Sequence, residues 1–378
     1  MSLSILPVRS SSALRRFVDV PWQVFDRRRD PTWVPPLRML VRDALDERRN
    51  HFYRDAARAL WIAERDGRVV GRIAAIENRA HNDFQGDRVG FFGFFECRDD
   101  PEAAGTLFDT AAAWLRGRGL TAMRGPVSPS MNHECGLLVD GFDEHPMFLT
   151  TWNPAYYVDL LRGAGFTGVK DLLGYHVSIA EPSFRLPDAF EAHARRAVAK
   201  QRVVFRDLDP RRWKAEVALC WEVYNAAWEP NWGFVPMSRA EFEQMAEGLR
   251  YLLWPRFAFA AEVDGEPAGF CLVLPDYARV LREIGTGRLL PTGLLKLLRG
   301  KQTLRTGRVM ALGVKKAYRT TGIFALFTHE LFRRGLAAGK TGGEASWILE
   351  DNDLMNRPLR ALGGRLYRRW RIYERPIA

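Results

Sequence analysis

The chain has 378 residues, which suits two domains, and its 47% hydrophobic and 27% charged residues are typical of a globular protein. This composition excludes a mostly disordered chain, a collagen-like protein and a disulfide scaffold, and no apolar run reaches the roughly 18–20 residues of a membrane-spanning helix. The 56 Lys and Arg against 45 Asp and Glu give a net charge of +11, which favours anionic partners such as phosphates, a coenzyme, an acidic carrier protein, an anionic bilayer surface or nucleic acid. Residues 1–10 lack the basic start and apolar core of a secretory signal, so we expect a cytoplasmic protein.

Two short segments of the chain repeat each other. Residues 63–71 and 261–269 share the pattern Ala-Glu-x-Asp-Gly-x-x-x-Gly, at an offset of 261 − 63 = 198. Apolar residues flank both copies, and the Asp-Gly pair supplies the positive φ angles that a tight hairpin turn needs. We therefore predict a β-hairpin at each position.

Further elements follow each hairpin in the same order. In the first half we predict strand 89–96, helix 101–116, strand 122–125, helix 154–161 and strand 172–179. In the second half we predict strand 308–314, helix 322–338, strand 346–349, helix 355–362 and strand 366–373. Asn153 and Asn352 precede the last helix of each half at an offset of 352 − 153 = 199, and a glycine ends each of these helices.

These matches in the same order and at nearly the same offset indicate a tandem duplication. We therefore predict an α/β fold of two tandem domains, residues 1–180 and 181–378, each a mixed central sheet flanked by helices. Residues 281–307 form an insertion, because only the shorter loop 77–88 joins the equivalent strands of the first half.

The insertion at 281–307 combines leucines with basic residues and contains Pro291. This pattern is typical of a basic amphipathic segment that lies in a membrane interface, so we expect a peripheral position on the inner membrane with an anionic surface as partner. A leucine-rich helix that packs on its own domain or on a second subunit is the alternative. The aromatic stretch 228–234 predicts either the lining of an acyl tunnel or core packing.

Residues 311–327 resemble the acyl-CoA-binding motif of GNAT acyltransferases, in which a strand leads through an Arg/Gln-x-x-Gly-x-Gly/Ala turn into a helix. Arg319 and Gly322 match this motif, and Phe324 stands where Gly or Ala is usual. Backbone N–H groups at a helix N-terminus bind anions, so the resemblance places the pyrophosphate of acyl-CoA, as donor substrate, at this turn. The residues that it implies in coenzyme binding are Leu312, Gly313, Val314, Arg319, Thr320, Thr321, Gly322, Ile323 and Asn356.

The two halves differ from this motif in separate ways. In the first half residues 99–104 lack the Arg-x-x-Gly, so we expect a degenerate GNAT-like domain that shapes the acceptor side. In the second half Leu359 stands where the family often has a tyrosine that protonates the departing thiolate. Protonation must then come from water or from another group.

Longer motifs extend the resemblance over nearly the whole chain. They are residues 30–36 (Asp-Pro-Thr-Trp-Val-Pro-Pro), 93–96, 125–130 (Gly-Pro-Val-Ser-Pro-Ser), 136–142, 152–157 and 346–352. Together they look like the bacterial ceramide synthase-like branch of GNAT proteins. The resemblance implies N-acylation of a sphingoid base by a fatty acyl-CoA.

Amide formation needs a neutral amine, a base and hydrogen-bond donors for the developing oxyanion. The resemblance places the acyl carbonyl between two splayed central strands, so N–H groups near 312–314 are the expected oxyanion donors. Glu350 is our first candidate for the base, with Asn352 beside it, and a surface carboxylate paired with an arginine is the alternative. His133 could titrate near neutrality as a third catalytic candidate, although a structural or solvated histidine is the simpler interpretation.

The acceptor pocket has four predicted contacts, Asn132, Tyr156, Tyr157 and Trp347, and core packing is favoured for at least one of the tyrosines. The four cysteines form no Cys-x-x-Cys, so we expect neither a metal site nor disulfides. Cys135 as an acyl-carrying nucleophile lacks a base placed by the sequence.

The sequence therefore predicts an acyl-CoA-dependent N-acyltransferase for a long-chain amino lipid base. One alternative is a transferase that acetylates a small amine, which the leucine-rich insertion disfavours. Another is a non-catalytic lipid-binding or scaffold protein, which Phe324 and Leu359 favour. An acyl carrier protein is an alternative donor partner, and dispersed arginines without a known module argue against nucleic acid.

Overall fold

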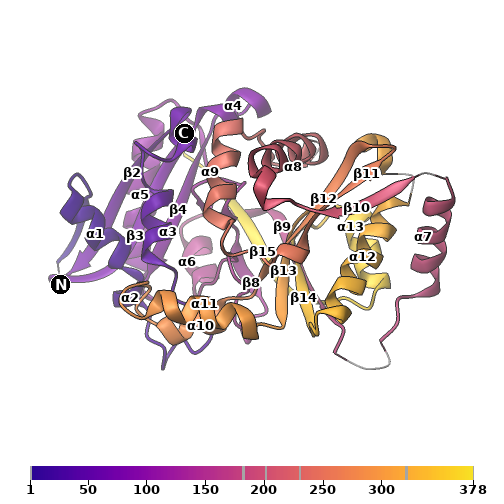
Figure 1. Cartoon of the computed structure of the whole chain (residues 1–378). Helices are drawn as coiled ribbons and strands as arrows, with labels where there is room; N and C mark the ends of the chain where they lie inside the picture. The colour runs from indigo at the N-terminus through magenta and orange to yellow at the C-terminus, as the bar shows by residue number, and fades with distance from the viewer. Residues whose placement is uncertain (1, 181–183, 201, 230, 320–321, 378) are drawn as a thin grey trace. The chain divides into compact units, whose positions relative to one another are not determined.

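The computed structural model describes residues 2–377 except 181–183, 201, 230 and 320–321 (Figure 1). The chain forms two compact units. The N-terminal unit comprises Met1–Leu172, Ala278–Leu298 and Arg368–Ala378, and the C-terminal unit comprises Leu173–Tyr277 and Arg299–Tyr367.

The N-terminal unit contains eight of the described strands from the first part of the chain. They are β1 (Leu3–Pro7), β2 (Ala56–Arg65), β3 (Arg68–Asn78), β4 (Val89–Cys97), β5 (Ala122–Gly125), β6 (Val127–Ser128), β7 (Glu134–Cys135) and β8 (Leu137–Asp140). Its helices are α1 (Ser11–Asp19), α2 (Pro21–Val24), α3 (Arg38–Ala44), η1 (His51–Arg54), α4 (Arg79–Gln85), α5 (Pro101–Arg116), α6 (Tyr157–Gly163) and α10 (Ala278–Ile284). Strands β1 to β4 are antiparallel neighbours, and β4 pairs with β5 in parallel.

The C-terminal unit repeats this order of elements. Its strands are β10 (Val203–Asp207), β11 (Ala258–Val263), β12 (Glu266–Pro275), β13 (Thr306–Val314) and β14 (Gly342–Leu349). Its helices are α7 (Asp188–Lys200), η2 (Pro210–Arg212), α8 (Trp213–Trp228), α9 (Arg239–Leu249), η3 (Pro255–Phe257), η4 (Lys316–Tyr318), α12 (Ile323–Ala337) and α13 (Asp353–Ala361). Strands β10 to β13 are antiparallel, and β13 pairs with β14 in parallel.

Three elements have residues in both units: β9 (Thr167–Ser178), α11 (Gly293–Thr303) and β15 (Arg365–Pro376). The last strand of the chain, β15, pairs with β5 from Tyr373↔Gly125 to Pro376↔Ala122, so it completes the N-terminal sheet. The last strand of the first half, β9, lies beside β14 in the strand order. The predicted division at residue 180 stays a prediction about the duplicated halves. The compact units do not follow that division, because β9 and β15 each have residues in both units.

The two predicted hairpins are present, and they match each other in detail. The turn residues have positive φ angles, 50° and 76° at Asp66 and Gly67 and 52° and 88° at Asp264 and Gly265. Each hairpin also has a register shift at the equivalent place, after Ala63 in β2 and after Ala261 in β11. The offset between the shifts is 261 − 63 = 198, the offset of the sequence repeat, so the duplication extends to backbone irregularities.

The predicted strands and helices are confirmed, with shifted ends. Helix α5 and strand β5 have the predicted bounds, whereas β14 begins at Gly342, four residues before the predicted 346. The insertion contains the second half of α10 and all of α11, where the equivalent loop of the first half contains α4. The sequence analysis omitted the strand and helices that open each half, because they lack Asp-Gly turns or a strict apolar period.

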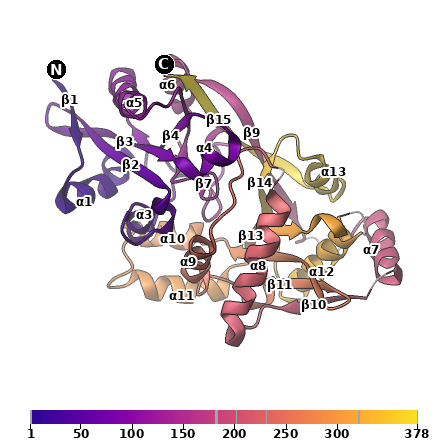
Figure 2. The ribbon, with the colours of Figure 1, turned by 90° about the horizontal axis from the view of Figure 1, so that it is seen from above.

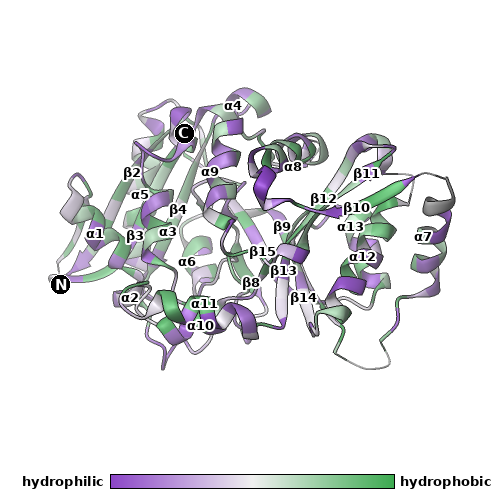
Figure 3. Ribbon diagram, in the orientation of Figure 1, coloured by the Kyte–Doolittle hydropathy of each residue, from purple (hydrophilic) through white to green (hydrophobic). Residues whose placement is uncertain are grey.

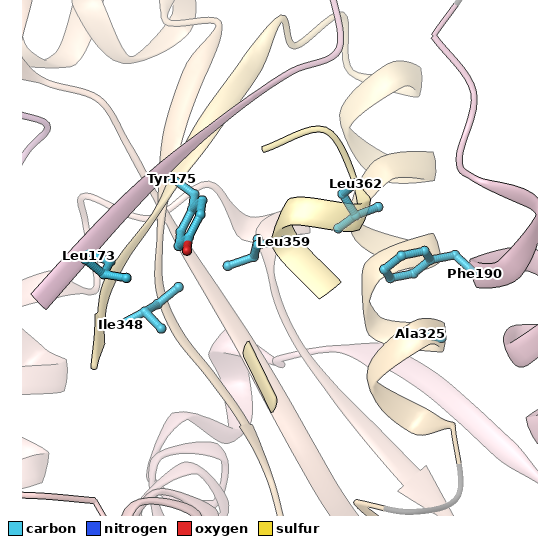
Figure 4. Close-up of a cluster of buried hydrophobic side chains, with 7 residues drawn as sticks. All are labelled: Leu173, Tyr175, Phe190, Ala325, Ile348, Leu359 and Leu362. Carbon is cyan, nitrogen blue, oxygen red and sulfur yellow. The ribbon is translucent and has the colours of Figure 1, made fainter. Parts of the chain in front are cut away.

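The C-terminal sheet is covered by helices on both faces (Figure 2). Helices α8 and α9 cover one face with a cluster that includes Val217, Val223 and Phe270. The cluster of α7, α12 and α13 contains Leu173, Tyr175, Phe190, Ala325, Ile348, Leu359 and Leu362 (Figure 4). Leu359, in place of the family's tyrosine, is therefore a core residue.

Candidate functional site

The two central strands of the C-terminal unit separate after a short paired stretch. Their described pairing runs from Thr306↔Gly342 to Val309↔Ala345 and stops there. Strand β13 continues to Val314 and β14 continues to Leu349. We call the point after Val309 and Ala345 the vertex, and the part of β13 beyond it the open edge.

Two backbone N–H groups of the open edge face away from β12. The Lys315 N–H donates to Ala268 O on the β12 side at 2.9 Å. Successive N–H groups of a strand alternate between its two edges, so those of Val314 and Leu312 face the side where β14 has diverged. They are the N–H groups that the sequence analysis assigned to donor binding. In this direction they can donate hydrogen bonds to the carbonyl oxygen of an amide or a thioester.

Gly313 lies between these two residues, and a side chain added there would press on α8. A Cβ at this position would lie 2.4 Å from the Trp228 ring and 3.3 Å from the Cβ of Ala227. The predicted aromatic stretch 228–234 is thus core at its first residue, where Trp228 stacks on Tyr224 at 4.7 Å. The end of helix α8 therefore packs against the open edge at Gly313.

Helix α12 begins directly after the open edge and turn. Gly322 has a φ of 82°, a left-handed conformation that suits glycine, and no side chain of the described residues caps the helix. The first N–H groups of a 15-residue helix then remain available for an anion. Phe324, the departure from the motif, packs against the α7–α12–α13 core cluster, so its ring does not replace these N–H groups.

Arg319 holds the turn between β13 and α12. Its Nε donates to Val314 O at 3.2 Å and its Nη2 donates to Ala227 O at 2.7 Å. These bonds fix the start of the turn to the end of α8. Thr320 and Thr321 lie outside the described residues.

The stretch of sequence that contains the open edge is rich in basic residues. Residues 284–329 contain no Asp or Glu, and they contain nine basic residues: Arg288, Lys296, Arg299, Lys301, Arg305, Arg308, Lys315, Lys316 and Arg319. Lys315 pairs with Glu222 at 2.6 Å. Of these residues, Lys315, Lys316 and Arg319 directly precede α12 in the chain, and positive charge near a helix N-terminus favours a phosphate-bearing ligand.

Several predicted site residues lie at the end of β14 and at the start of α13. Glu350 is exposed at the end of β14, and Asn352 precedes α13, where its carbonyl accepts from the Asn356 N–H at 2.9 Å. The Asn356 side chain is buried and donates to Leu349 O at 3.0 Å and to Glu350 O at 3.1 Å. Its Oδ1 has no hydrogen-bond partner among the described residues. Asn356 therefore fixes the end of β14, and its role toward a coenzyme stays a prediction.

A buried polar cluster lies at the vertex, and the sequence analysis missed it. Arg308 and Glu344 are register partners on β13 and β14 with an ion-pair distance of 3.8 Å, and both are almost completely buried. The Arg308 Nε donates to Ser346 Oγ at 2.9 Å, and the Ser346 hydroxyl donates to Glu344 Oε1. The Tyr367 hydroxyl donates to Glu344 Oε2. We call these four residues the vertex cluster.

Trp347 follows the vertex cluster on β14. Its half-buried ring lies under the Arg308 guanidinium, 4.6 Å from the centroid. The ring therefore contacts the cluster, and its role as a substrate contact stays a prediction.

In the N-terminal unit, Asn132 and His133 lie in a loop closed by Ser130. The Asn132 N–H donates to Ser130 Oγ at 3.2 Å, and Ser130 Oγ lies 2.8 Å from His133 Nδ1. Burial lowers the pKa of His133 to about 4. The lowered pKa keeps the ring neutral near pH 7, and the catalytic role of His133 stays a prediction.

Tyr156 and Tyr157 both bind the end of β4. The Tyr156 hydroxyl donates to Cys97 O at 2.8 Å, and the Cys97 N–H donates to the Tyr157 hydroxyl at 2.6 Å. Burial raises the pKa of both phenols, so neither forms a phenolate near neutrality. Tyr157 is completely buried, in agreement with the expected core role for one of the pair.

The described cysteines, Cys97, Cys135, Cys220 and Cys271, are all buried and free. Burial raises the pKa of three of these thiols, Cys97, Cys220 and Cys271, to about 12. Within the described ranges, no group of three or more metal-ligating side chains occurs, and no helix is long and apolar enough to span a bilayer.

The whole chain resembles a solved structure with two tandem domains. It aligns over 100% of its length, and over 99% of the other chain, with the tandem GNAT protein from the clavulanic acid biosynthesis pathway, at a TM-score of 0.58 and 13% identity. Identity this low shows the fold alone. The fold of the chain is therefore that of tandem GNAT proteins, as predicted.

Sequence relatives identify the family. The chain is 34% identical to the bacterial ceramide synthase of Caulobacter vibrioides (strain NA1000 / CB15N), over 99% of this chain and 98% of the relative. It is 32% identical to protein YghO of Escherichia coli (strain K12), over 96% of this chain and 93% of that protein. No family model matches the chain. The chain belongs to the family of the bacterial ceramide synthase and is an N-acyltransferase of the GNAT type.

Proposed function

We propose that the chain transfers a fatty acyl group from acyl-CoA to the amine of a sphingoid-type lipid base. The observation that carries the proposal is the open edge of β13, where two N–H groups face the gap left by β14. Acyl-CoA offers amides and a thioester carbonyl to these groups and a pyrophosphate to the start of α12. The family relative named ceramide synthase supports the choice of acceptor.

Several of the predicted site residues have a role in this proposal. The N–H groups of Leu312 and Val314 bind the acyl donor, and Arg319 and Gly322 shape the pyrophosphate turn. The exposed Glu350, next to Asn352, takes the first proton when the ammonium form of the acceptor becomes a neutral amine. The N-terminal unit supplies the acceptor side, where a neutral His133 and its neighbour Asn132 act through hydrogen bonds rather than as bases.

Mass spectrometry of the purified protein with detergent-dispersed sphinganine tests the proposal. The donors are acyl-CoAs from acetyl to stearoyl and the corresponding acyl carrier protein thioesters. We expect N-acyl product from the long-chain CoA donors. Product from acetyl-CoA on small amines would favour the acetyltransferase alternative. Product from the carrier protein thioesters would show that an acyl carrier protein, and not CoA, carries the acyl group. No product and no thermal shift with CoA would leave a non-catalytic lipid binder.

Gly322→Asp locates the donor site, because its carboxylate would stand where the pyrophosphate binds. Gly339→Asp is the matched control: Gly339 also has a positive φ, 62°, and it follows the other end of the same helix, with no atom within 4 Å of an added Cβ. Both variants place an aspartate at a positive φ and add the same charge. Loss of CoA binding in Gly322→Asp alone supports the site, and equal binding by both contradicts it.

We also propose that α11 and the segment before it rest on an anionic membrane surface. Leu290 and Leu298 expose 75% and 55% of their surface, and Leu294 and Leu295 are exposed as well, whereas Leu297 is buried. Apolar and polar residues lie next to each other on α11 (Figure 3). Basic residues surround these leucines without an acidic residue between 284 and 329, so the charge complements anionic headgroups.

Flotation with vesicles of phosphatidylcholine, with and without phosphatidylglycerol, tests the membrane proposal. We expect binding to the anionic vesicles, reduced at least several-fold by Leu294→Ser combined with Leu298→Ser. Leu354→Ser is the control, since Leu354 is 71% exposed on α13, outside this surface. A concentration-dependent dimer that the double variant abolishes, with no vesicle binding, would assign the surface to a second copy instead.

A further inference from the structure

We propose that Ser346 and Glu344 form the proton route of the acyl transfer, an inference that rests on the function proposed above. In this route the Ser346 hydroxyl receives the proton of the attacking amine and passes its own proton to Glu344. The same pair then returns a proton to the departing thiolate. Ser346 touches the substrate, and Glu344 acts through Ser346.

The position of the vertex cluster places it at the reacting end of the donor. The open edge runs from Val314, next to α12, back to the vertex at Val309. A donor with its pyrophosphate at α12 and its arm along this edge therefore points its thioester toward the vertex. Leu312 is three residues from Val309, which corresponds to about 10 Å of strand. Ser346 is the first residue of β14 after the last paired residue, Ala345.

The Ser346 hydroxyl oxygen can accept one further hydrogen bond. Its hydroxyl donates to Glu344 Oε1, and one oxygen lone pair accepts from Arg308 Nε at 2.9 Å. A serine hydroxyl has two lone pairs, so one remains for an amine N–H. The arrangement joins that lone pair to a carboxylate through one hydrogen bond.

The surroundings of Glu344 keep the transferred proton in the site. Glu344 has no exposed surface, and its second oxygen accepts from the Tyr367 hydroxyl. When Glu344 is protonated, Arg308 keeps its bond to Ser346 O at 3.2 Å and its position over the Trp347 ring. The cation therefore retains partners in both protonation states.

The bonds and protons balance over the two steps. In the first step the C–N bond forms, the amine N–H proton moves to Ser346 Oγ, and the Ser346 proton moves to Glu344. In the second step the C–S bond breaks, Glu344 returns its proton to Ser346, and Ser346 protonates the thiolate. Once Glu350 has taken the first proton, these two steps need no acid or base beyond the pair, which accounts for a core leucine, Leu359, where the family often has a tyrosine.

Glu344→Gln and Ser346→Ala test the route in the full-length protein. We expect kcat to fall by about 10²–10³-fold, with an unchanged KM for the acyl-CoA, because a positioned acid–base group contributes about 10²–10⁴-fold. We also expect kcat in Glu344→Gln to rise with pH where the wild type has levelled off, since solvent must then remove the proton. A structural role alone would not change the pH profile in this way.

Two controls separate proton transfer from packing. Glu216→Gln breaks another buried carboxylate–arginine pair of the same unit, in which Glu216 lies 2.8 Å from Arg206. It should lower the melting temperature without changing the pH profile. Tyr367→Phe keeps the Glu344 carboxylate and should cost only several-fold in kcat.

Full activity of Glu344→Gln at unchanged CoA affinity would overturn the route, and so would equal pH profiles in Glu344→Gln and Glu216→Gln. A wild-type protein without product from any donor would instead contradict the proposed function. The two failures are thus distinguished by the wild-type measurement alone.

Discussion

The two units treat the same strand edge in opposite ways. In the C-terminal unit β13 and β14 separate after Val309↔Ala345, and the edge of β13 stays open. In the N-terminal unit β4 and β5 pair only from Val89↔Ala122 to Phe91↔Arg124, but the following segment covers the edge. There the Phe94 N–H donates to Ser128 Oγ at 3.0 Å.

The corresponding edge of β4, which we call the closed edge, also ends differently from the open edge of β13. The Arg98 N–H donates to Val70 O, just as the Lys315 N–H donates to Ala268 O, so Cys97 corresponds to Val314. The Cys97 N–H faces the closed side and is bound by Tyr157, and its carbonyl is bound by Tyr156. Buried backbone groups need partners, and the N-terminal unit satisfies this edge with its own side chains. The donor site that we propose lies on the open edge of the C-terminal unit.

The largest expected effect is a difference in stability between variants of two glycines, Gly93 on β4 and Gly313 on the equivalent strand β13. A Cβ at Gly93 would lie 1.5 Å from the carbonyl oxygen of Val127, which is backbone, whereas a Cβ at Gly313 meets the movable Trp228 ring at 2.4 Å. We expect Gly93→Ala to destabilise the protein by more than about 3 kcal/mol, and Gly313→Ala by about 1 kcal/mol. Urea unfolding measures both, and equal losses would contradict the contrast between a closed and an open edge.

The second prediction concerns acid. Burial lowers the pKa of His81 and His133, both in the N-terminal unit, to about 4. In the unfolded chain histidine has a pKa near 6.5 and binds a proton as the pH falls, while the folded rings stay neutral. Stability is therefore present above pH 6.5 and is lost between about pH 6.5 and pH 4, by about 2 kcal/mol per histidine at pH 4.5.

Hydrogen exchange at pH 7 and pH 4.5 checks this prediction. Amides of β3 and β4 should lose more protection than those of β12 and β13, and the variant His133→Gln should reduce the difference. Equal loss in both units would show that these histidines do not control acid stability.

The smallest expected effect comes from the tyrosines that close the β4 edge. Tyr157→Phe leaves the buried Cys97 N–H without its partner and should cost about 1 kcal/mol in unfolding free energy. Tyr156→Phe removes the bond to the neighbouring carbonyl and should cost less, because a carbonyl has a second lone pair. Acyl transfer lost in Tyr156→Phe at unchanged stability would instead support its predicted acceptor role.

Local sequence patterns predicted the parts of the fold that local forces determine. The Asp66-Gly67 and Asp264-Gly265 turns depend on two adjacent residues, so the hairpins could be located without a structure. The open edge was also predictable, because residues 311–327 resemble a known motif, with matches at Arg319 and Gly322.

The vertex cluster could not be found in this way. Arg308 and Glu344 are 344 − 308 = 36 residues apart, and only the register of a parallel pair brings them together. The available signal was a single charged residue within each otherwise apolar strand. The tyrosines at 156 and 157 were equally ambiguous, since their role depends on the end of β4, which is nearly 60 residues earlier.

The order of the strands has a consequence for biosynthesis. Strand β15 follows the whole second half in the sequence, yet it places Trp370 and Ile372 in the N-terminal unit with no exposed surface, and Arg369 and Arg371 bind Asp171 there. The edge of β5 that pairs with β15 therefore stays unpaired during synthesis of the second half, until β15 has left the ribosome. A nascent chain that stalls before β15 would expose a strand edge from its first half.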